Sequence, residues 1–409
     1  MTSHDAQARE GIPARSREAV PTRAIVFLSI AAFASAATTR ICDGMLPQIS
    51  TDFAVTAGAA AQVITAYSAS YGLLQIATGL LGDRFGKARV LLIAAIASLF
   101  TTLACAAATT LTDLIWARLF AGAAASGIVP LSLAWLGDNI SYDIRQGVIA
   151  RFISGQIGGV VFGLAFGGVI GEAFGWRTAF WLIAALYVVA TTGLLLQFGS
   201  AARARAEAAP TAGSFASLAA VLRRRWARVV LLATFAEGFL CFGALAYVTS
   251  MLHLRFGMGF AAAGLTLSAF GVGGLLFSFM APRIVRRFGE PGGARLASIL
   301  FALAFLGYAL MPWAWIAVPS SFLAGLAYYA LHNVLQVNAT QMAPDARGVA
   351  VALFASAAFL GQGLGVAVAA PVVDLYGAQP VFLVAALLLP CCAILFARAI
   401  DRRGAQMHG

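Results

Sequence analysis

Apolar runs of about 20 residues, separated by short polar or charged breaks, follow one another along almost the whole chain, and this is the length at which an α-helix crosses the hydrocarbon core of a bilayer. Proline, glycine and clusters of charge mark the breaks. The pattern predicts an all-α membrane protein with twelve transmembrane helices. We place these helices at 25–49, 59–81, 90–110, 112–137, 147–171, 177–198, 227–251, 260–282, 295–312, 317–341, 348–371 and 380–398.

The second half of the chain repeats landmarks of the first half at an offset of about 202 residues. The Arg-Phe-Gly at 84–86 recurs at 287–289, and Gly159 is answered by Gly361. Common order and spacing indicate an internal duplication. The sequence therefore predicts two pseudo-symmetric six-helix bundles. The expected parts are an N-terminal tail (1–24), a first bundle (25–198), a linker (199–226), a second bundle (227–398) and a C-terminal tail (399–409), with the tails and linker cytoplasmic.

Composition and charge support a membrane protein and orient it. The chain is 61% hydrophobic and 11% charged, with a net charge of +11. If the N-terminus is cytoplasmic, 23 of the 27 basic residues fall on that side, as the positive-inside rule requires. The basic excess then marks a face beside anionic lipid rather than a nucleic-acid site. We expect a multi-pass protein of the cell (inner) membrane with both termini cytoplasmic. The five cysteines lie in apolar runs without metal-ligand spacing, so we expect no metal or cofactor.

One charged turn, at 79–89, joins two apolar runs and is short enough to require antiparallel helices. It resembles the signature loop of the major facilitator superfamily, G-x-L-[AG]-D-[RK]-x-G-[RK]-[RK]. The tenth place holds Ala88, with Arg89 one step later. The resemblance implies the twelve-helix, two-bundle fold of that family and a transporter that works by alternating access. The matching residues are Gly79, Leu81, Gly82, Asp83, Arg84, Gly86 and Lys87.

The same resemblance implies a cytoplasmic gate. In the family, the aspartate of this loop and its basic neighbours close the inner side, so Asp83 would act with the cations Arg84 and Lys87. Asp138, at the inner end of the fourth predicted helix, matches the acidic partner. The alternative is a solvated turn that only sets topology. The second copy of the loop has Arg286 where Asp83 stands, so we expect an asymmetric gate.

The predicted helix at 147–171 carries glycine at every fourth position, which puts a bare stripe on one helix face and lets a neighbouring helix pack backbone to backbone. The run at 159–168 also resembles the G-x-x-x-G-P-x-x-G-G motif of drug:proton antiporters, with Leu164 in place of the proline. This resemblance implies proton-coupled export. The replacement of the motif's proline by Leu164 counts against antiport in particular. The predicted seam residues are Gly155, Gly159, Gly163, Gly167 and Gly168.

Polar side chains within the predicted spans are functional candidates, because charge inside a bilayer is costly. Arg40 and Asp43 are three residues apart and share a helix face. Family architecture places the first, fourth, seventh and tenth helices around a central cavity. The candidates for substrate binding or proton coupling on these helices are Arg40, Asp43, Arg118, Glu237, His332, Asn333 and Gln336.

Each candidate has two readings. Asp43 or Glu237 could carry the coupling proton, and the two arginines Arg40 and Arg118 could tune that carboxyl or hold a substrate anion. His332 could relay protons or bind substrate, because imidazole titrates near neutral pH. The alternatives are a solvated position near the outer rim for Asp43, a helix-seam role for Glu237, a packed polar residue at His332 and a purely structural role for Arg118.

These observations predict a secondary active transporter, with proton-coupled export of small organic molecules as the first hypothesis. The alternative is a proton symporter or exchanger for a small organic anion. No phosphate-binding G-x-x-x-x-G-K-[ST] loop occurs, which disfavours ATP-driven transport. A non-transporting sensor or an enzyme is a remote alternative. The expected partners are a small-molecule substrate, protons and the lipid bilayer, with no nucleic acid, and we expect a monomer.

Overall fold

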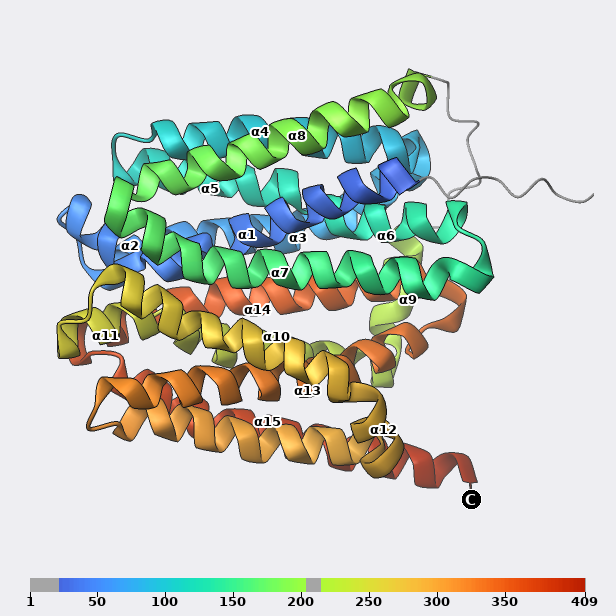
Figure 1. Cartoon of the computed structure of the whole chain (residues 1–409). Coiled ribbons are helices and arrows are strands. Elements are labelled where there is room, and N and C mark those ends of the chain that lie inside the picture. Colours follow the sequence, from blue (N-terminus) through green and yellow to red (C-terminus); the bar gives the residue numbers. More distant parts are fainter. Residues whose placement is uncertain (1–21, 204–214, 409) are drawn as a thin grey trace, which may run out of the picture.

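A computed structural model describes residues 22–203 and 215–408, and within these ranges every regular element is a helix (Figure 1). The predicted N-terminal tail therefore lies largely outside the described residues, as does part of the predicted linker. The elements are α1 (Thr22–Asp52), α2 (Ala57–Ala60), α3 (Gln62–Phe85), α4 (Lys87–Ala107), α5 (Leu111–Ala125), α6 (Ile128–Asn139), α7 (Tyr142–Phe174), α8 (Trp176–Arg203), α9 (Phe215–Arg223), α10 (Arg225–Leu245), α11 (Val248–Phe256), α12 (Phe260–Leu310), η1 (Ala314–Ile316), α13 (Ala317–Gln341), η2 (Pro344–Ala346), α14 (Arg347–Tyr376) and α15 (Gln379–His408).

The described helices account for twelve membrane spans. Ten helical segments are long and apolar enough to cross a bilayer. One of them, the 51-residue α12, contains a non-helical residue at Gly289 (φ 65°), where the chain turns back on itself. It therefore supplies two antiparallel spans. The 24-residue α3 is less apolar than the ten but packs among them, against α5 and α14, and is the twelfth span. The all-α, twelve-helix fold predicted from the apolar runs is confirmed.

Two predicted helices are broken in the middle. The predicted helix at 112–137 divides into α5 and α6 at Ser126 and Gly127. The Ser126 hydroxyl donates to the Ala123 carbonyl at 2.7 Å, a local bond that competes with the helical ladder. The predicted helix at 227–251 divides into α10 and α11, where the Tyr247 hydroxyl donates to the Val366 carbonyl of α14 at 2.8 Å. Hydrophobic periodicity does not predict either break, because the residues on both sides of each break are apolar.

The duplication is visible in the backbone. Among the described residues, left-handed φ angles occur three times in each half, at offsets of 202 or 203 residues. Each of these residues lies where one helix ends and another begins, so the two halves turn at corresponding points. The pairs are Ala54 (φ 51°) with Gly257 (64°), Gly86 (90°) with Gly289 (65°), and Gly175 (84°) with Gly377 (76°).

The two halves are stacked side by side (Figure 1). The first half comprises α1 to α8 and the second α10 to α15, and they meet where α7 packs on α12 and α3 packs on α14. We call the end of the molecule that contains α9 and the α3–α4 turn the α9 end. We call the opposite end, which contains α2 and α11, the α2 end.

The glycine stripe of α7 packs against the backbone of α1. A Cβ added to Gly163 would lie 2.6 Å from the Ala37 carbonyl oxygen, and one added to Gly167 would lie 2.5 Å from the Ile41 carbonyl oxygen. Gly159 meets the backbone of α1 in the same way, whereas Gly155 has more room, with its nearest neighbour 3.7 Å away. Close backbone approach of this kind is what small residues permit in a membrane.

Gly168 packs in a different direction from the rest of the stripe. A Cβ added there would overlap the Phe260 carbonyl oxygen and lie 3.1 Å from the Cα of Gly264, both on α12. This glycine therefore lies on the boundary between the halves. In the second half, α14 repeats the α7 stripe, since Gly361 and Gly365 meet the carbonyls of Phe235 and Phe239 on α10.

Replacing a seam glycine should destabilise the fold. We expect Gly163→Val to lower the free energy of unfolding by about 1–3 kcal/mol, because the added methyl groups meet the α1 backbone rather than a movable side chain. Thermal unfolding of the purified protein in detergent measures the effect. The control is Gly147→Val on the same helix, where an added Cβ meets nothing within 4 Å. Equal Tm values for the two variants would contradict the seam.

Candidate functional site

A cavity of about 1020 Å³ lies between the two halves. At its inner limit it is lined by Arg40 and Gln362, in the middle of the molecule. At the α9 end it is lined by Asp83 and Arg347, whose side chains are exposed. The cavity therefore opens at the α9 end and has its blind end near the centre of the molecule.

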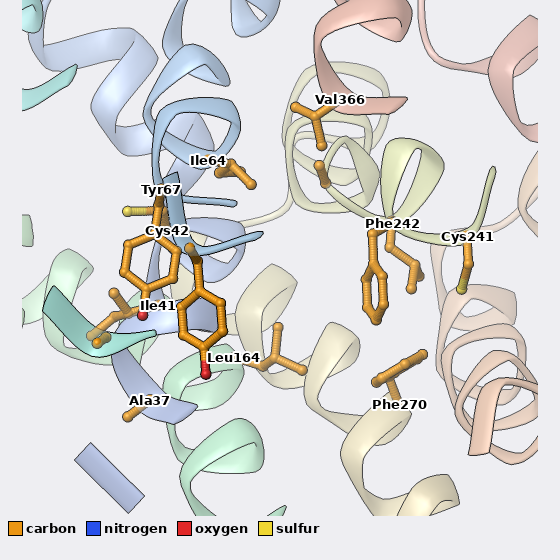
Figure 2. Packing of buried hydrophobic residues seen from close by; sticks show 14 of the residues in the cluster. Ala37, Ile41, Cys42, Ile64, Tyr67, Leu164, Cys241, Phe242, Phe270 and Val366 are labelled. Carbon is orange, nitrogen blue, oxygen red and sulfur yellow. The ribbon is translucent and has the colours of Figure 1, made fainter. Parts of the chain in front are cut away.

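Aromatic side chains from both halves form much of the cavity wall. Tyr71 of α3 stacks on Phe359 of α14, with ring centroids 4.0 Å apart. Phe242 of α10 meets Phe270 of α12 edge to face at 5.9 Å, and Figure 2 shows the ring of Phe242 pointing toward the ring of Phe270. Such a wall accommodates apolar and planar groups, while a small number of polar side chains supply direction.

Arg40 and Asp43 form an ion pair at the blind end, as their spacing predicts. The distance from Arg40 Nη1 to Asp43 Oδ2 is 3.3 Å. Arg40 Nη2 also donates to Gln362 Oε1 of α14 at 3.0 Å, and Gln362 Nε2 donates to the Ser68 hydroxyl of α3 at 2.9 Å. The guanidinium carbon of Arg40 lies 3.7 Å from the centroid of the Phe242 ring. Arg40 thus joins both halves, and its partners leave little of it open to the cavity.

His332 and Glu237 form the second polar pair. His332 Nδ1 lies 2.8 Å from Glu237 Oε2. The carboxylate is fully buried on α10, and within the described part of the chain its Oε1 has no hydrogen-bond partner. The imidazole lines the cavity and stacks on Tyr328 at 4.9 Å. His332 therefore stands between the cavity and a buried acid.

Asn333 and Gln336 accompany His332 on α13 and also line the cavity. They add amide donors and acceptors beside the imidazole ring. The expected polar surface of the tenth predicted helix is therefore present on the cavity wall.

Arg118 does not face the cavity, in contrast to the expectation that the fourth predicted helix presents it there. The side chain is fully buried. Its Nη1 donates to the Thr38 carbonyl at 2.8 Å and its Nε donates to the Val63 carbonyl at 3.3 Å. The guanidinium also lies 4.0 Å from the Tyr67 ring. Arg118 thus links α5 to α1 and α3, and sequence spacing could not reveal this because the acceptors are backbone atoms of other helices.

The signature-loop residues lie at the mouth of the cavity. Lys87 forms an ion pair with Asp138 across α4 and α6, so the structure brings these two predicted partners together. Asp83 and Gly79 line the mouth itself. Arg84 lies over the ring of the adjacent Phe85, 5.3 Å from its centroid.

The turn at Gly86 has a φ of 90°, a conformation that favours glycine. A bare glycine at this position lets α3 and α4 reverse direction without a longer loop. Among the described residues, the ion pair of this loop is the one between Lys87 and Asp138. It lies within the first half and does not connect the two halves.

A twelve-helix membrane protein with a central cavity closed at one end has the architecture of a membrane carrier. The chain belongs to the major facilitator superfamily, whose family model matches residues 28–344. It is therefore a multi-pass membrane transporter for small molecules and not an enzyme.

Several relatives are similar to this chain over different spans. YwfA of Bacillus subtilis, an uncharacterised transporter of this type, is 24% identical over 400 residues, or 95% of each chain. A probable sugar efflux transporter of Mannheimia succiniciproducens is 29% identical over 238 residues, or 56% of each chain. The multidrug export protein EmrB of Haemophilus influenzae is 27% identical over 155 residues, which cover 38% of this chain and 30% of that protein.

Solved structures show the same fold. The nucleoside transporter NupG superposes with a TM-score of 0.72 at 18% identity, covering 91% of this chain and 98% of NupG. A bacterial homologue of the human lysosomal transporter Spinster, in an inward-facing and unoccupied conformation, superposes with a TM-score of 0.71 at 16% identity. This match covers 93% of this chain and 98% of that one.

The different surroundings of Arg118 and His332 predict different mutant behaviour. We expect Arg118→Leu to destabilise the protein by about 1–3 kcal/mol, because the carbonyls of Thr38 and Val63 would lose a charged donor. His332→Gln should leave the Tm nearly unchanged, because an amide at the cavity wall can still bond to Glu237. Thermal unfolding in detergent compares the two variants. A stable Arg118→Leu protein would contradict the structural role of this arginine.

Proposed function

We propose that this protein is a proton-coupled exporter of small organic molecules that works by alternating access across the cell's inner membrane. The observation that carries the proposal is the contact between His332, on the cavity wall, and the fully buried Glu237. A buried carboxylate next to a cavity-facing imidazole gives protons a path between the cavity and the acid.

The charge distribution supports an orientation. The cationic segments at 84–89, 223–228 and 283–295 belong to the α9 end, whereas Arg177 and Arg255 lie at the α2 end. By the positive-inside rule the α9 end is cytoplasmic, so the cavity opens to the cytoplasm.

The same orientation is consistent with the domain layout that we propose. The bundles at 25–198 and 227–398 are the two moving bodies, and the linker at 199–226 and both termini are cytoplasmic. The chain acts as a monomer in this proposal. The bacterial origin of relatives such as YwfA supports the inner membrane.

Coupling follows from the charge of the His332–Glu237 pair. With one proton the pair is neutral, either as an ion pair or as two uncharged groups. Without that proton the pair carries a buried negative charge, which is unfavourable unless a cation or a hydrogen-bond donor compensates it. A substrate with such a group in the cavity and the proton would therefore compete for the same place, which is the requirement for exchange.

The cavity wall supports a substrate with an apolar or aromatic body and a cationic or donor group. Rings such as Phe242, Phe270 and Tyr328 line the cavity, and aromatic rings favour planar and cationic groups. The organic-anion alternative loses its support, because Arg40 already bonds to Asp43 and Gln362 and because Arg118 does not line the cavity. The names of the efflux and export relatives support outward transport.

The mouth of the cavity supports a gating role for the signature loop. A Cβ added to Gly79 or to Gly348, which line the mouth from α3 and α14, would meet nothing within 4 Å. We propose that the helix surfaces at Gly79 and Gly348 come into contact when the cytoplasmic side closes. In that state Asp83 gains hydrogen-bond or ion-pair partners from the second half. The close approach of Gly168 to Gly264, between the halves, then lets the halves rock against each other.

Transport in proteoliposomes tests the proton path. With acid imposed on the outer face, we expect efflux of planar aromatic cations to exceed efflux of sugars or aromatic carboxylates. Glu237→Gln should reduce the pH-driven component at least about tenfold, because the pair can no longer exchange its proton. Substrate counterflow without a pH gradient should remain, and it serves as the internal control. Unchanged stimulation by the pH gradient in Glu237→Gln would refute proton coupling at this pair.

A side chain at Gly79 should block closure of the cytoplasmic side. We expect Gly79→Val to reduce turnover at least about tenfold while the affinity for substrate in the open cavity stays within about twofold, because only the closed state is crowded. Binding by isothermal calorimetry and flux in proteoliposomes separate these quantities. The control is Gly404→Val, at the same end of the molecule, where an added Cβ also meets nothing within 4 Å. Parallel loss of binding and flux in Gly79→Val would count against gating.

A further inference from the structure

Two carboxylates join the halves at the α2 end. Glu172, near the C-terminal end of α7, accepts a hydrogen bond at 2.6 Å from the backbone N–H of Ala261, in the first turn of α12. Asp374, near the C-terminal end of α14, accepts one at 2.8 Å from the backbone N–H of Gly58, in the first turn of α2. Asp374 also accepts from the Thr56 hydroxyl at 2.7 Å.

These two contacts are related by the internal duplication. The carboxylates are 202 residues apart and the amides that they bind are 203 residues apart. The first half therefore supplies a carboxylate to a helix start of the second half, and the second half returns the same contact. The amides at a helix start have no partner within the helix and carry partial positive charge, so each contact has favourable electrostatics.

The backbone is shaped for these contacts. A Cβ added to Gly58 would lie 2.5 Å from Asp374 Oδ2, and one added to Gly259 would lie 3.1 Å from Glu172 Oε2. Close to the Glu172 contact, Gly168 of α7 and Gly264 of α12 are also in close approach. Glycine therefore lets the opposing helix come near each carboxylate in both copies of the repeat.

We propose that Glu172 and Asp374 form an outer clamp, which holds the α2 end closed while the cavity is open at the α9 end and which releases when the α2 end opens. The proposal rests on the alternating access described under the proposed function. Both contacts cross between the halves, so separating the halves at the α2 end must break both of them together. The two carboxylates are positioning residues for the conformational change and do not touch the cavity.

Asp113 provides a matched comparison. It lies exposed at the same end and accepts a hydrogen bond at 2.9 Å from the backbone N–H of Thr110, at the start of α5. Its chemistry is that of the clamp, but both partners belong to the first half. If Glu172 and Asp374 only cap helices, substituting them should affect the protein as substituting Asp113 does. If they form a clamp, substituting them should shift the balance between the conformations, whereas substituting Asp113 should not.

Distance measurements across the α2 end test the clamp. Spin labels at Thr112→Cys and Pro312→Cys, exposed positions of the first and second halves, would be placed in the full chain after its five cysteines are replaced by serine. The protein would be measured in lipid nanodiscs without substrate by pulsed electron paramagnetic resonance. Both Glu172→Gln and Asp374→Asn should raise the ratio of long to short distances about two- to fivefold, and the double variant should raise it by about the product.

The Asp113→Asn variant should leave the distance distribution unchanged. An unchanged distribution in both single variants, or an equal shift in Asp113→Asn, would overturn the clamp. If the double variant does not yield folded protein, the two single variants decide the question by themselves. Because no substrate or pH gradient is used, a failure of the proposed proton coupling would not alter this result, and a failure of the clamp would leave the transport assay intact.

Discussion

A carboxylate buried within a bilayer must be neutralised, and the proposed transport cycle depends on how Glu237 meets this requirement. Glu237 Oε2 lies 2.8 Å from His332 Nδ1, and the imidazole lines the cavity. A charged group in the cavity beside this ring would change the electrostatic balance of the acid behind it. Arg40 and Asp43 meet the same requirement differently, since they neutralise each other and Arg40 also donates a hydrogen bond to Gln362 of the opposite half. One pair can thus respond to the cavity, while the other joins the halves at its blind end.

Close backbone packing within each half explains how a local contact between the halves can matter for the whole molecule. Glycines on α7 and α14 let each half pack tightly within itself, with α7 seated on α1 and α14 on α10. The halves meet along helix pairs such as α7 with α12 and α3 with α14, and in the proposed cycle each half moves as a unit. Gly168 and Gly264 are in contact across that boundary, and the carboxylates Glu172 and Asp374 bridge it at the α2 end. At the mouth of the cavity, by comparison, a Cβ added to Gly79 would meet nothing within 4 Å.

Much of the fold could be predicted from the sequence, because apolar run length and the 202-residue repeat are linear properties of the chain. Pairs of residues close in the sequence could also be predicted, as the ion pair between Arg40 and Asp43 illustrates. The orientation of Arg118 was not, since its acceptors are backbone carbonyls of other helices. Helix breaks inside apolar runs gave no signal, and the Glu172 and Asp374 contacts were missed because each is a single acid near a helix end. The repeat offset itself was the signal that could have paired these two acids.

The central claim is that a proton and a substrate compete at the His332–Glu237 pair. The most direct measurement is proton release on binding, followed with a pH indicator in weakly buffered detergent solution as a planar aromatic cation is added. The account predicts release of about one proton per bound cation for the unaltered protein and almost none for Glu237→Gln, because binding is linked to the protonation of the pair. Saturable binding of the cation to the unaltered protein without proton release would contradict it.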